Sequence, residues 1–267
     1  MQRTFFIYIL TLSILVPINA QRLTSFLAPG TDNTAIVVCP GGSYFWHDTK
    51  TEGTDVAQWL QQQGISAFVL DYRTGGVPAF ILHFRLLFRG NRYPDAQDDL
   101  REALQHIRQH ATETGINPKR IGVMGFSAGG HLAMSAAELF PQEERPSFVA
   151  AIYPVVTMTE PCVHKRSRRG LLGDSRVRNE QLCDLLSLER HVPDDCPPVF
   201  IVNCKDDPVV HYHNSELLDD ALTAHGIAHQ YIQYTTGGHG FGTSDTKGSD
   251  ESRQWKERFI EWLNTLF

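Results

Sequence analysis

The sequence predicts an α/β protein, with a mostly parallel β-sheet covered by helices on both faces, in a single domain. Apolar runs of strand length alternate with segments of helical periodicity, an alternation typical of parallel sheets whose strands are connected by helices. The chain of 267 residues is 42% hydrophobic and 20% charged, which is ordinary for one large globular domain. No repeat, low-complexity tract or linker divides it.

The predicted elements follow one another along the whole chain. The apolar runs that we expect to be strands are residues 34–39, 65–70, 120–124, 148–153, 199–204 and 229–234. The segments with a helical pattern are residues 53–63, 94–112, 132–139, 215–225 and 249–266. In sheets of this kind ligands bind at the carboxyl ends of the strands. Residues that directly follow a strand are therefore the candidates for function.

Two segments interrupt this alternation. Residues 74–91 contain an apolar stretch at a strand exit, and residues 157–197 are long, polar and rich in turn-forming residues. Loops of this length are usually lids or binding loops. We expect residues 157–197 to be a lid or insertion on the ligand-binding side of the sheet. Its basic cluster, residues 164–169, is expected to be a solvated loop that an anionic sugar could use.

The first twenty residues are typical of an export leader. A positively charged start precedes an apolar run over residues 4–16, and the small residue Ala20 suits cleavage before Gln21. A buried first strand would also explain the apolar run, although not the basic start. We therefore expect residues 1–20 to be a signal peptide, residues 21–267 to form the folded domain, and the protein to be periplasmic or secreted.

Charge and metal-binding patterns exclude several function classes. The formal net charge is −6 and no basic stripe runs through the chain, which argues against a nucleic-acid partner. His211 and His213 could be half of a metal site, but two histidines without further clustered ligands are usually surface residues. We expect no metal, no other cofactor and no stable membrane anchor.

The chain has five cysteines, so at least one stays free. Cys39 and Cys204 end strand-like runs and are expected to be buried. Any disulfide should form among Cys162, Cys183 and Cys196, which share one loop-rich segment.

Ser127 lies in a Gly-x-Ser-x-Gly pattern between a predicted strand and a predicted helix. Such turns are common in α/β proteins, so the pattern alone is weak evidence. A nucleophilic serine also needs a base, an acid that orients the base, and N–H donors for the oxyanion. The ends of other predicted strands must supply these groups.

Each of these groups has a candidate at a strand end. His239, flanked by glycines after the last strand, is the candidate base, and Asp207, beside a proline after the preceding strand, is the candidate acid. Asp206 could instead orient that turn. The alternative interpretations are non-catalytic: His239 would lie on an ordinary flexible loop, and the two aspartates would belong to a common Asp-Pro turn.

The candidate oxyanion donors are the backbone N–H groups of Gly42, Ser43 and Ala128. The first two follow the first clear strand, and the third begins the helix after Ser127, where the helix dipole favours negative charge. The chain order of serine, aspartate and histidine is that of one hydrolase fold and differs from the chymotrypsin and subtilisin orders.

From about residue 35 onward, the chain resembles the α/β-hydrolase superfamily, and most closely the small bacterial acetylxylan and feruloyl esterases (BD-FAE-like). The matching segments are residues 40–44, 71–73, 93–94, 99, 117–131, 171–173, 197–200, 206–207 and 238–242. The resemblance implies Ser127 as nucleophile, His239 as base and Asp207 as acid. It also implies the oxyanion donors named above. Tyr44 and His164 are the expected substrate contacts.

The chain departs from the family pattern in two places. Residues 40–44 form the expected oxyanion turn. Ser43 stands where this turn usually carries a third glycine in the family. The segment before residue 35 is also short, so one or two of the usual amino-terminal strands are expected to be missing.

The resemblance implies an exported serine esterase that hydrolyses acetyl or feruloyl esters on plant polysaccharides through a covalent acyl-enzyme. The alternatives are a broad small-ester carboxylesterase, a peptidase of the prolyl-oligopeptidase kind and an inactive sugar-binding domain. We expect ester rather than glycoside hydrolysis, because the sequence singles out no carboxylate pair. The expected partner is a small-molecule or oligosaccharide ester, and the oligomeric state stays open.

Overall fold

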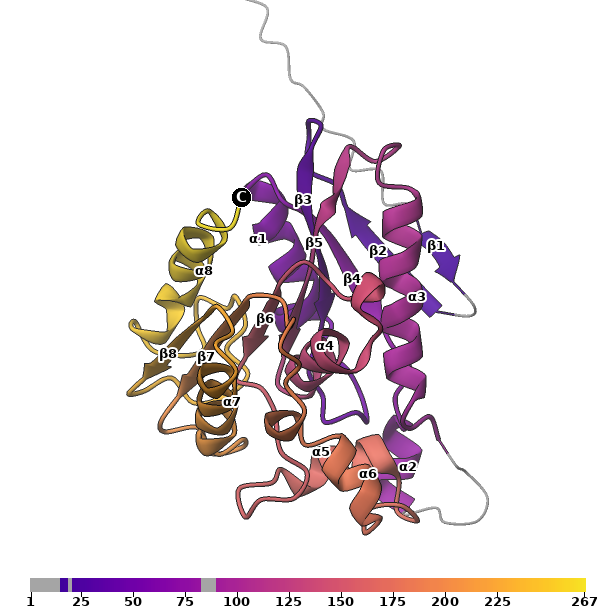
Figure 1. The fold of residues 1–267 in the computed structure, drawn as a ribbon, viewed down its shortest axis with the longest axis vertical. Coiled ribbons are helices and arrows are strands. Elements are labelled where there is room, and N and C mark those ends of the chain that lie inside the picture. Colours follow the sequence, from indigo (N-terminus) through magenta and orange to yellow (C-terminus); the bar gives the residue numbers. More distant parts are fainter. Residues whose placement is uncertain (1–14, 19–20, 83–89) are drawn as a thin grey trace, which may run out of the picture.

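The computed structural model describes residues 15–18, 21–82 and 90–267, which form a sheet between two layers of helices (Figure 1). Eight strands of this described part form the sheet, in the order β1-β2-β4-β3-β5-β6-β7-β8. In this spatial order, every pair of neighbours from β4 through β3 to β8 is parallel. Strand β2 is antiparallel to both of its neighbours, β1 and β4. The predicted α/β class with a mostly parallel sheet is confirmed.

All six predicted strands are present, and two more precede them. The strands are β1 (Leu15–Ile18), β2 (Gln21–Phe26), β3 (Asn33–Cys39), β4 (Ser66–Asp71), β5 (Ile116–Phe126), β6 (Val149–Ile152), β7 (Val199–Cys204) and β8 (His229–Tyr234). With β1 counted, the expected shortage of one or two amino-terminal strands is therefore wrong. Because β1 lies within the predicted leader, cleavage before Gln21 would remove β1 and keep β2; the leader itself stays a prediction.

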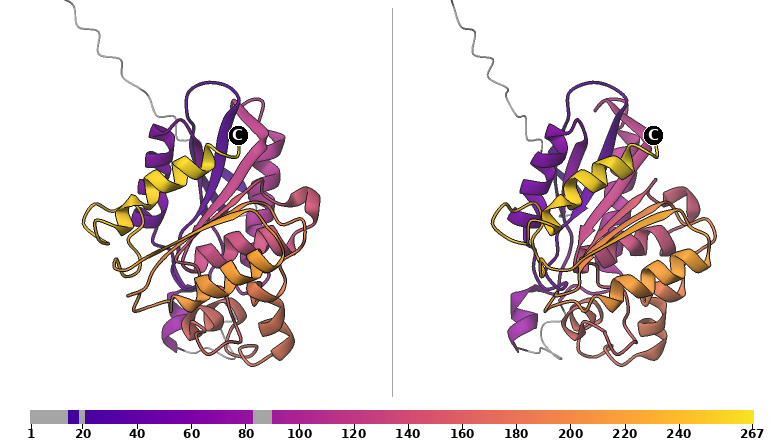
Figure 2. Two further views of the ribbon diagram at one scale, coloured as in Figure 1. Left: turned by 60° about the vertical axis from the view of Figure 1, so that its left-hand side comes forward. Right: turned by 90° about the vertical axis from the view of Figure 1, so that its left-hand side faces the viewer.

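Helices cover both faces of the sheet, as the alternation predicts (Figure 2). The α-helices are α1 (Asp55–Gln62), α2 (Gly76–Leu82), α3 (Asp95–Gln109), α4 (Ala128–Leu139), α5 (Lys165–Leu172), α6 (Glu180–Leu185), α7 (His213–Ala224) and α8 (Trp255–Leu263). Shorter turns of helix are η1 (Lys50–Thr54), η2 (Gln142–Glu144), η3 (Leu188–Arg190) and η4 (Ser252–Gln254). In the described chain, no helix is both long enough and apolar enough to span a bilayer.

Each face of the sheet has its own apolar core. Helices α1 and α8 pack on one face through residues such as Leu60 and Trp255. Helices α3, α4 and α7 pack on the other face through residues such as Leu104, Leu132 and Leu218. Burial of apolar side chains on both faces accounts for the continuous apolar runs of the central strands.

The insertion over residues 157–197 is packed more tightly than a solvated loop. Helices α5 and α6 and the turn η3 occupy it, and Leu172, Leu186 and Leu188 are fully buried in the core shared with α4. The basic cluster begins α5, so the expectation of a solvated loop there is wrong. Helices α2, α5 and α6 lie together beyond one end of the sheet (Figure 1).

Candidate active site

Ser127 occupies a sharp turn between β5 and α4. Its backbone has φ 54° and ψ −117°, a conformation that a residue with a side chain seldom adopts. The flanking glycines make the turn possible. A Cβ atom on Gly125 would lie 1.9 Å from the carbonyl oxygen of Gly129, and one on Gly129 would lie 2.0 Å from that of Cys39. Helix α4 consequently begins at Ala128, four residues before the predicted start.

Three side chains predicted to act together form one hydrogen-bonded chain. The Oγ of Ser127 lies 2.9 Å from Nε2 of His239, and Nδ1 of His239 lies 2.6 Å from Oδ2 of Asp207. The other oxygen of Asp207 accepts the N–H groups of Val209 and Val210 at 2.7 and 2.9 Å. Its side chain is 1% exposed, so the carboxylate is buried and fixed. It holds the Nδ1–H tautomer of His239, which leaves Nε2 free to accept from the serine.

Asp206 has a different position. Its carboxylate accepts the N–H groups of Gly238 at 2.8 Å and Gly237 at 3.3 Å, in the loop that leads to His239. Asp206 thus shapes the loop of residues 236–242, here called the histidine loop, and makes no hydrogen bond with the His239 imidazole in the described structure, as the alternative interpretation of Asp206 anticipated.

The candidate oxyanion turn lies against Ser127. A Cβ atom on Gly41 would lie 3.0 Å from Cβ of Ser127. Gly42 and Ser43 both have positive φ, 142° and 57°, and the carbonyl of Gly42 accepts from Phe45 N–H at 3.0 Å. Within the described chain, no acceptor is recorded for the N–H of Ser43 or of Ala128. Buried N–H groups without an acceptor suit a site that receives an oxyanion.

The side chain of Tyr44 is buried within the protein, so the structure does not support the predicted substrate contact, which stays a prediction. Its side chain is 2% exposed, and its hydroxyl lies 2.9 Å from Nδ1 of His131. Nε2 of His131 in turn lies 2.9 Å from the carbonyl oxygen of Leu186. Burial lowers the pKa of His131 to about 4, so the ring is neutral: Nε2–H donates to Leu186 and Nδ1 accepts from the tyrosine. Tyr44 therefore ties the oxyanion turn to α4 and to the insertion.

His164, the second expected substrate contact, is close enough to the candidate triad for the charges of His239 and Asp207 to act on its pKa. It precedes α5, and its Nδ1 lies 2.8 Å from Oγ of Ser167. Burial lowers the pKa of His164 to about 4; positive charge at His239 and Arg166 acts in the same direction, and Asp207 opposes it. The ring is therefore neutral near pH 7. Contact with a substrate stays a prediction.

An aromatic rim, Trp46 and Phe80, lies beside the oxyanion turn and is not among the site residues predicted from the sequence. A Cβ atom on Gly42 would lie 2.9 Å from Cδ1 of Trp46, and the rings of Trp46 and Phe80 meet edge to face at 5.1 Å. Both side chains are half-buried, and the exposed guanidinium of Arg166 lies 5.8 Å from the Phe80 ring. The available signals were the aromatic pair directly after the glycine turn and the apolar stretch of residues 77–82.

The other arginines of the basic cluster are structural. Arg169 donates to the carbonyl oxygens of Ala79 and Phe80 at 2.9 and 2.8 Å, which joins α5 to α2. Arg168 donates to the carbonyl of Met158 at 2.9 Å. A Cβ atom on Gly170 would lie only 2.1 Å from the carbonyl oxygen of Ser43, so the backbone of α5 packs directly against the oxyanion turn.

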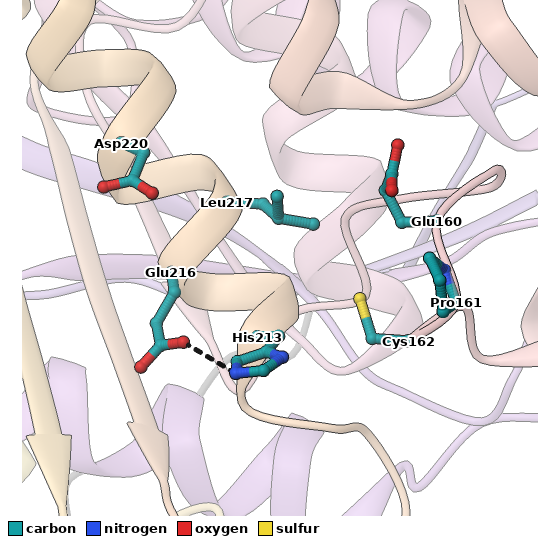
Figure 3. Close-up of a pocket in the computed structure, with 7 residues that line it drawn as sticks. All are labelled: Glu160, Pro161, Cys162, His213, Glu216, Leu217 and Asp220. Carbon is teal, nitrogen blue, oxygen red and sulfur yellow. Dashed lines mark ion pairs between the residues drawn. The ribbon is translucent and has the colours of Figure 1, made fainter.

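All five cysteines are free, so no disulfide forms among Cys162, Cys183 and Cys196. The described residues contain no group of three or more side chains suited to a metal ion. His213 instead pairs with Glu216 at 3.3 Å. That pair lines a hollow of about 330 Å³ between α7 and the loop of residues 160–162, and none of the candidate triad residues lines it (Figure 3).

Comparison with known proteins supports the fold and gives the family. The BD-FAE family model matches residues 27–222. The chain is 33% identical over 225 residues to an acetylxylan esterase of Xylanibacter ruminicola, a match covering 83% of this chain and 44% of that protein. It is also 33% identical over 216 residues to endo-1,4-beta-xylanase B of Butyrivibrio fibrisolvens, covering 77% and 32%. The chain thus spans less than half the length of these two relatives.

Solved structures share the whole architecture. An acetyl ester-xyloside bifunctional hydrolase from Caldicellulosiruptor lactoaceticus superposes with a TM-score of 0.81 at 30% identity, covering 92% of this chain and 88% of that one. MGS-M1, an alpha/beta hydrolase enzyme from a deep-sea metagenome library, superposes with a TM-score of 0.72 at 21% identity, covering 95% and 96%. The chain therefore has the α/β-hydrolase fold and belongs to the BD-FAE family.

Proposed function

We propose that the protein is a serine esterase that removes short acyl groups, chiefly acetyl, from plant polysaccharides. The observation that carries this proposal is the hydrogen-bonded chain from Ser127 through His239 to Asp207, next to the N–H groups of Ser43 and Ala128, which have no acceptor among the described residues. Membership of the BD-FAE family and similarity to an acetylxylan esterase support the ester class.

In the proposed mechanism, Ser127 Oγ attacks the ester carbonyl while Nε2 of His239 takes its proton. The N–H groups of Ala128 and Ser43, with that of Gly42, stabilise the oxyanion of the tetrahedral intermediate. The intermediate collapses as His239 returns the proton to the departing sugar oxygen, and an acyl-enzyme remains. A water molecule then repeats the sequence, with His239 as base, and releases acetate. Throughout, Asp207 stabilises the imidazolium.

The surroundings of the site favour a sugar as the alcohol part of the ester. Half-buried Trp46 and Phe80 offer aromatic surface for a sugar ring, while His164 and exposed Arg166 offer groups that bond hydroxyls. A feruloyl group would use the same aromatic surface. A broad small-ester carboxylesterase with no glycan role is the second candidate, because this rim would accept other cyclic alcohols as well.

We propose ester rather than glycoside hydrolysis. Two carboxylates of the described site, Asp207 and Glu52, are both buried and bonded within the protein. Glycosidases need two carboxyl groups that face the substrate from either side. We also propose export, on the basis of the leader-like residues 1–20.

Replacing Ser127 tests the proposed nucleophile. Ser127→Ala should lower turnover of 4-nitrophenyl acetate by roughly a millionfold, because it removes the hydroxyl on which the proposed acyl-enzyme forms. Circular dichroism should show an unchanged fold. Activity within tenfold of the unmodified protein would exclude Ser127 as the nucleophile.

The two neighbouring aspartates should differ strongly. Asp207→Asn should lower kcat by roughly ten-thousandfold, because an asparagine cannot hold the required histidine tautomer. Asp206→Asn should cost far less, since it only weakens the two N–H bonds to the histidine loop. Steady-state kinetics on one acetate ester measures both variants, and a more damaging Asp206→Asn would show that the acid is misassigned.

Acyl length and the alcohol part test the substrate class. Acetate esters should be hydrolysed much faster than octanoate esters, as expected for an insertion without a broad apolar helix face. Arg166→Gln should alter kcat/KM for acetylated xylo-oligosaccharides more than for 4-nitrophenyl acetate, because Arg166 lies at the rim. Arg178→Gln, which changes another exposed arginine of the insertion, is the matched control. Faster octanoate turnover, or equal effects on both substrates, would contradict this assignment.

A further inference from the structure

Glu52 is a buried carboxylate next to the candidate active site that the mechanism above does not use. It lies in η1 and is 3% exposed. Burying a carboxylate is costly unless hydrogen bonds satisfy its oxygens. No lysine or arginine pairs with it in the part of the chain that the structure describes. Its two oxygens must therefore be accounted for by other partners.

One oxygen of Glu52 holds the oxyanion turn. Oε2 accepts the N–H of Gly41 at 2.7 Å. A Cβ atom on Gly41 would lie 2.6 Å from this oxygen, so only glycine allows such a close approach. The bond fixes the Pro40–Gly41 peptide, directly before the peptides that carry the N–H groups of Gly42 and Ser43.

The other oxygen of Glu52 connects to the histidine loop. Oε1 accepts the hydroxyl of Tyr153 at 2.8 Å, and the same hydroxyl accepts the N–H of Gly242 at 2.9 Å. The Tyr153 ring also packs against the His239 ring, with centroids 4.7 Å apart. A Cβ atom on Gly242 would lie 2.3 Å from the carbonyl oxygen of Thr51, so η1 itself touches this loop.

We propose that Glu52 is a positioning residue that holds the oxyanion turn and the histidine loop in register through Gly41 and Tyr153. The inference rests on the proposed function. It assigns no direct contact with the substrate to Glu52. Two loops far apart in sequence must keep Ser43 N–H and His239 Nε2 at fixed distances from the same ester. Glu52 is hydrogen-bonded directly to the first loop and, through Tyr153, to the second.

The hydrogen-bond count shows why a carboxylate is required. Three donors enter the network, from Gly41, Tyr153 and Gly242, and three oxygens accept them, two from Glu52 and one from Tyr153. Burial raises the pKa of Glu52, while the Tyr153 hydroxyl, the charge of His239 and the Gly41 N–H act to lower it. A glutamine would remove one acceptor and add two donors. Either orientation of its amide leaves a buried donor unsatisfied.

The test compares Glu52→Gln, Tyr153→Phe and the double variant, with 4-nitrophenyl acetate as substrate. Glu52→Gln should lower kcat about 10- to 100-fold with KM nearly unchanged, because the misplaced donors act on the transition state. Tyr153→Phe should act in the same direction. The double variant should be no worse than the more damaged single variant, because both residues belong to one network.

Controls separate positioning from general loss of structure. Glu138→Gln changes another buried glutamate, on α4, whose oxygens have no recorded hydrogen-bond partner in the described chain, and should leave kcat within about twofold. Unchanged kcat in both single variants, a rise in KM alone, or multiplicative losses in the double variant would overturn the proposal. If Glu52→Gln does not fold, Tyr153→Phe decides: the same loss of kcat supports the proposal and unaltered kcat overturns it.

Ser127→Ala, assayed in parallel, separates this inference from the proposed function. If Ser127→Ala remains active, the proposed function fails and the inference fails with it. If Ser127→Ala is inactive while Glu52→Gln and Tyr153→Phe keep the full kcat, the inference alone is overturned.

Discussion

Close contact between backbones at the turn holding Ser127 is the constraint on which the site depends. The turn brings Gly125 against Gly129, and Gly129 against Cys39 at the end of β3, so that Ser127 is held at positive φ. A conformation of this kind costs on the order of 1–3 kcal/mol, which burial of β5 and α4 in the core offsets. The same contact starts α4 at Ala128 and places Ser127 next to the oxyanion turn that follows β3.

Much of the fold is predictable from sequence because the central strands are buried on both faces. All residues of β7 are buried, for example, and its first four, residues 199–202, form a continuous apolar run. Strand β2, at the antiparallel side of the sheet, was missed because four of its six residues are polar, so Gln21–Phe26 contains no apolar run. Helices α5 and α6 were missed because they are short and mostly polar, and their few leucines reach a core built largely by other elements.

Around Ser127, too, some side chains of the site are predictable from the sequence and others are not. Ser127, Asp207 and His239 stand out because each occupies a local glycine- or proline-marked turn at the end of a strand. The position of Tyr44 could not be predicted, because its partner His131 lies 87 residues away. The bond between Glu52 and Tyr153 spans 101 residues, and no local pattern indicates it. Long-range polar contacts depend on how the loops pack, which composition and periodicity do not encode.

The central claim is that Ser127 is a nucleophile activated by His239. The most direct measurement is mass spectrometry of the intact protein and of its proteolytic peptides after incubation with an alkyl fluorophosphonate, which phosphonylates activated serines. The account predicts a single adduct, on the peptide that contains Ser127, and no adduct in the His239→Ala variant. An unmodified protein, or an adduct on a different residue, would contradict it.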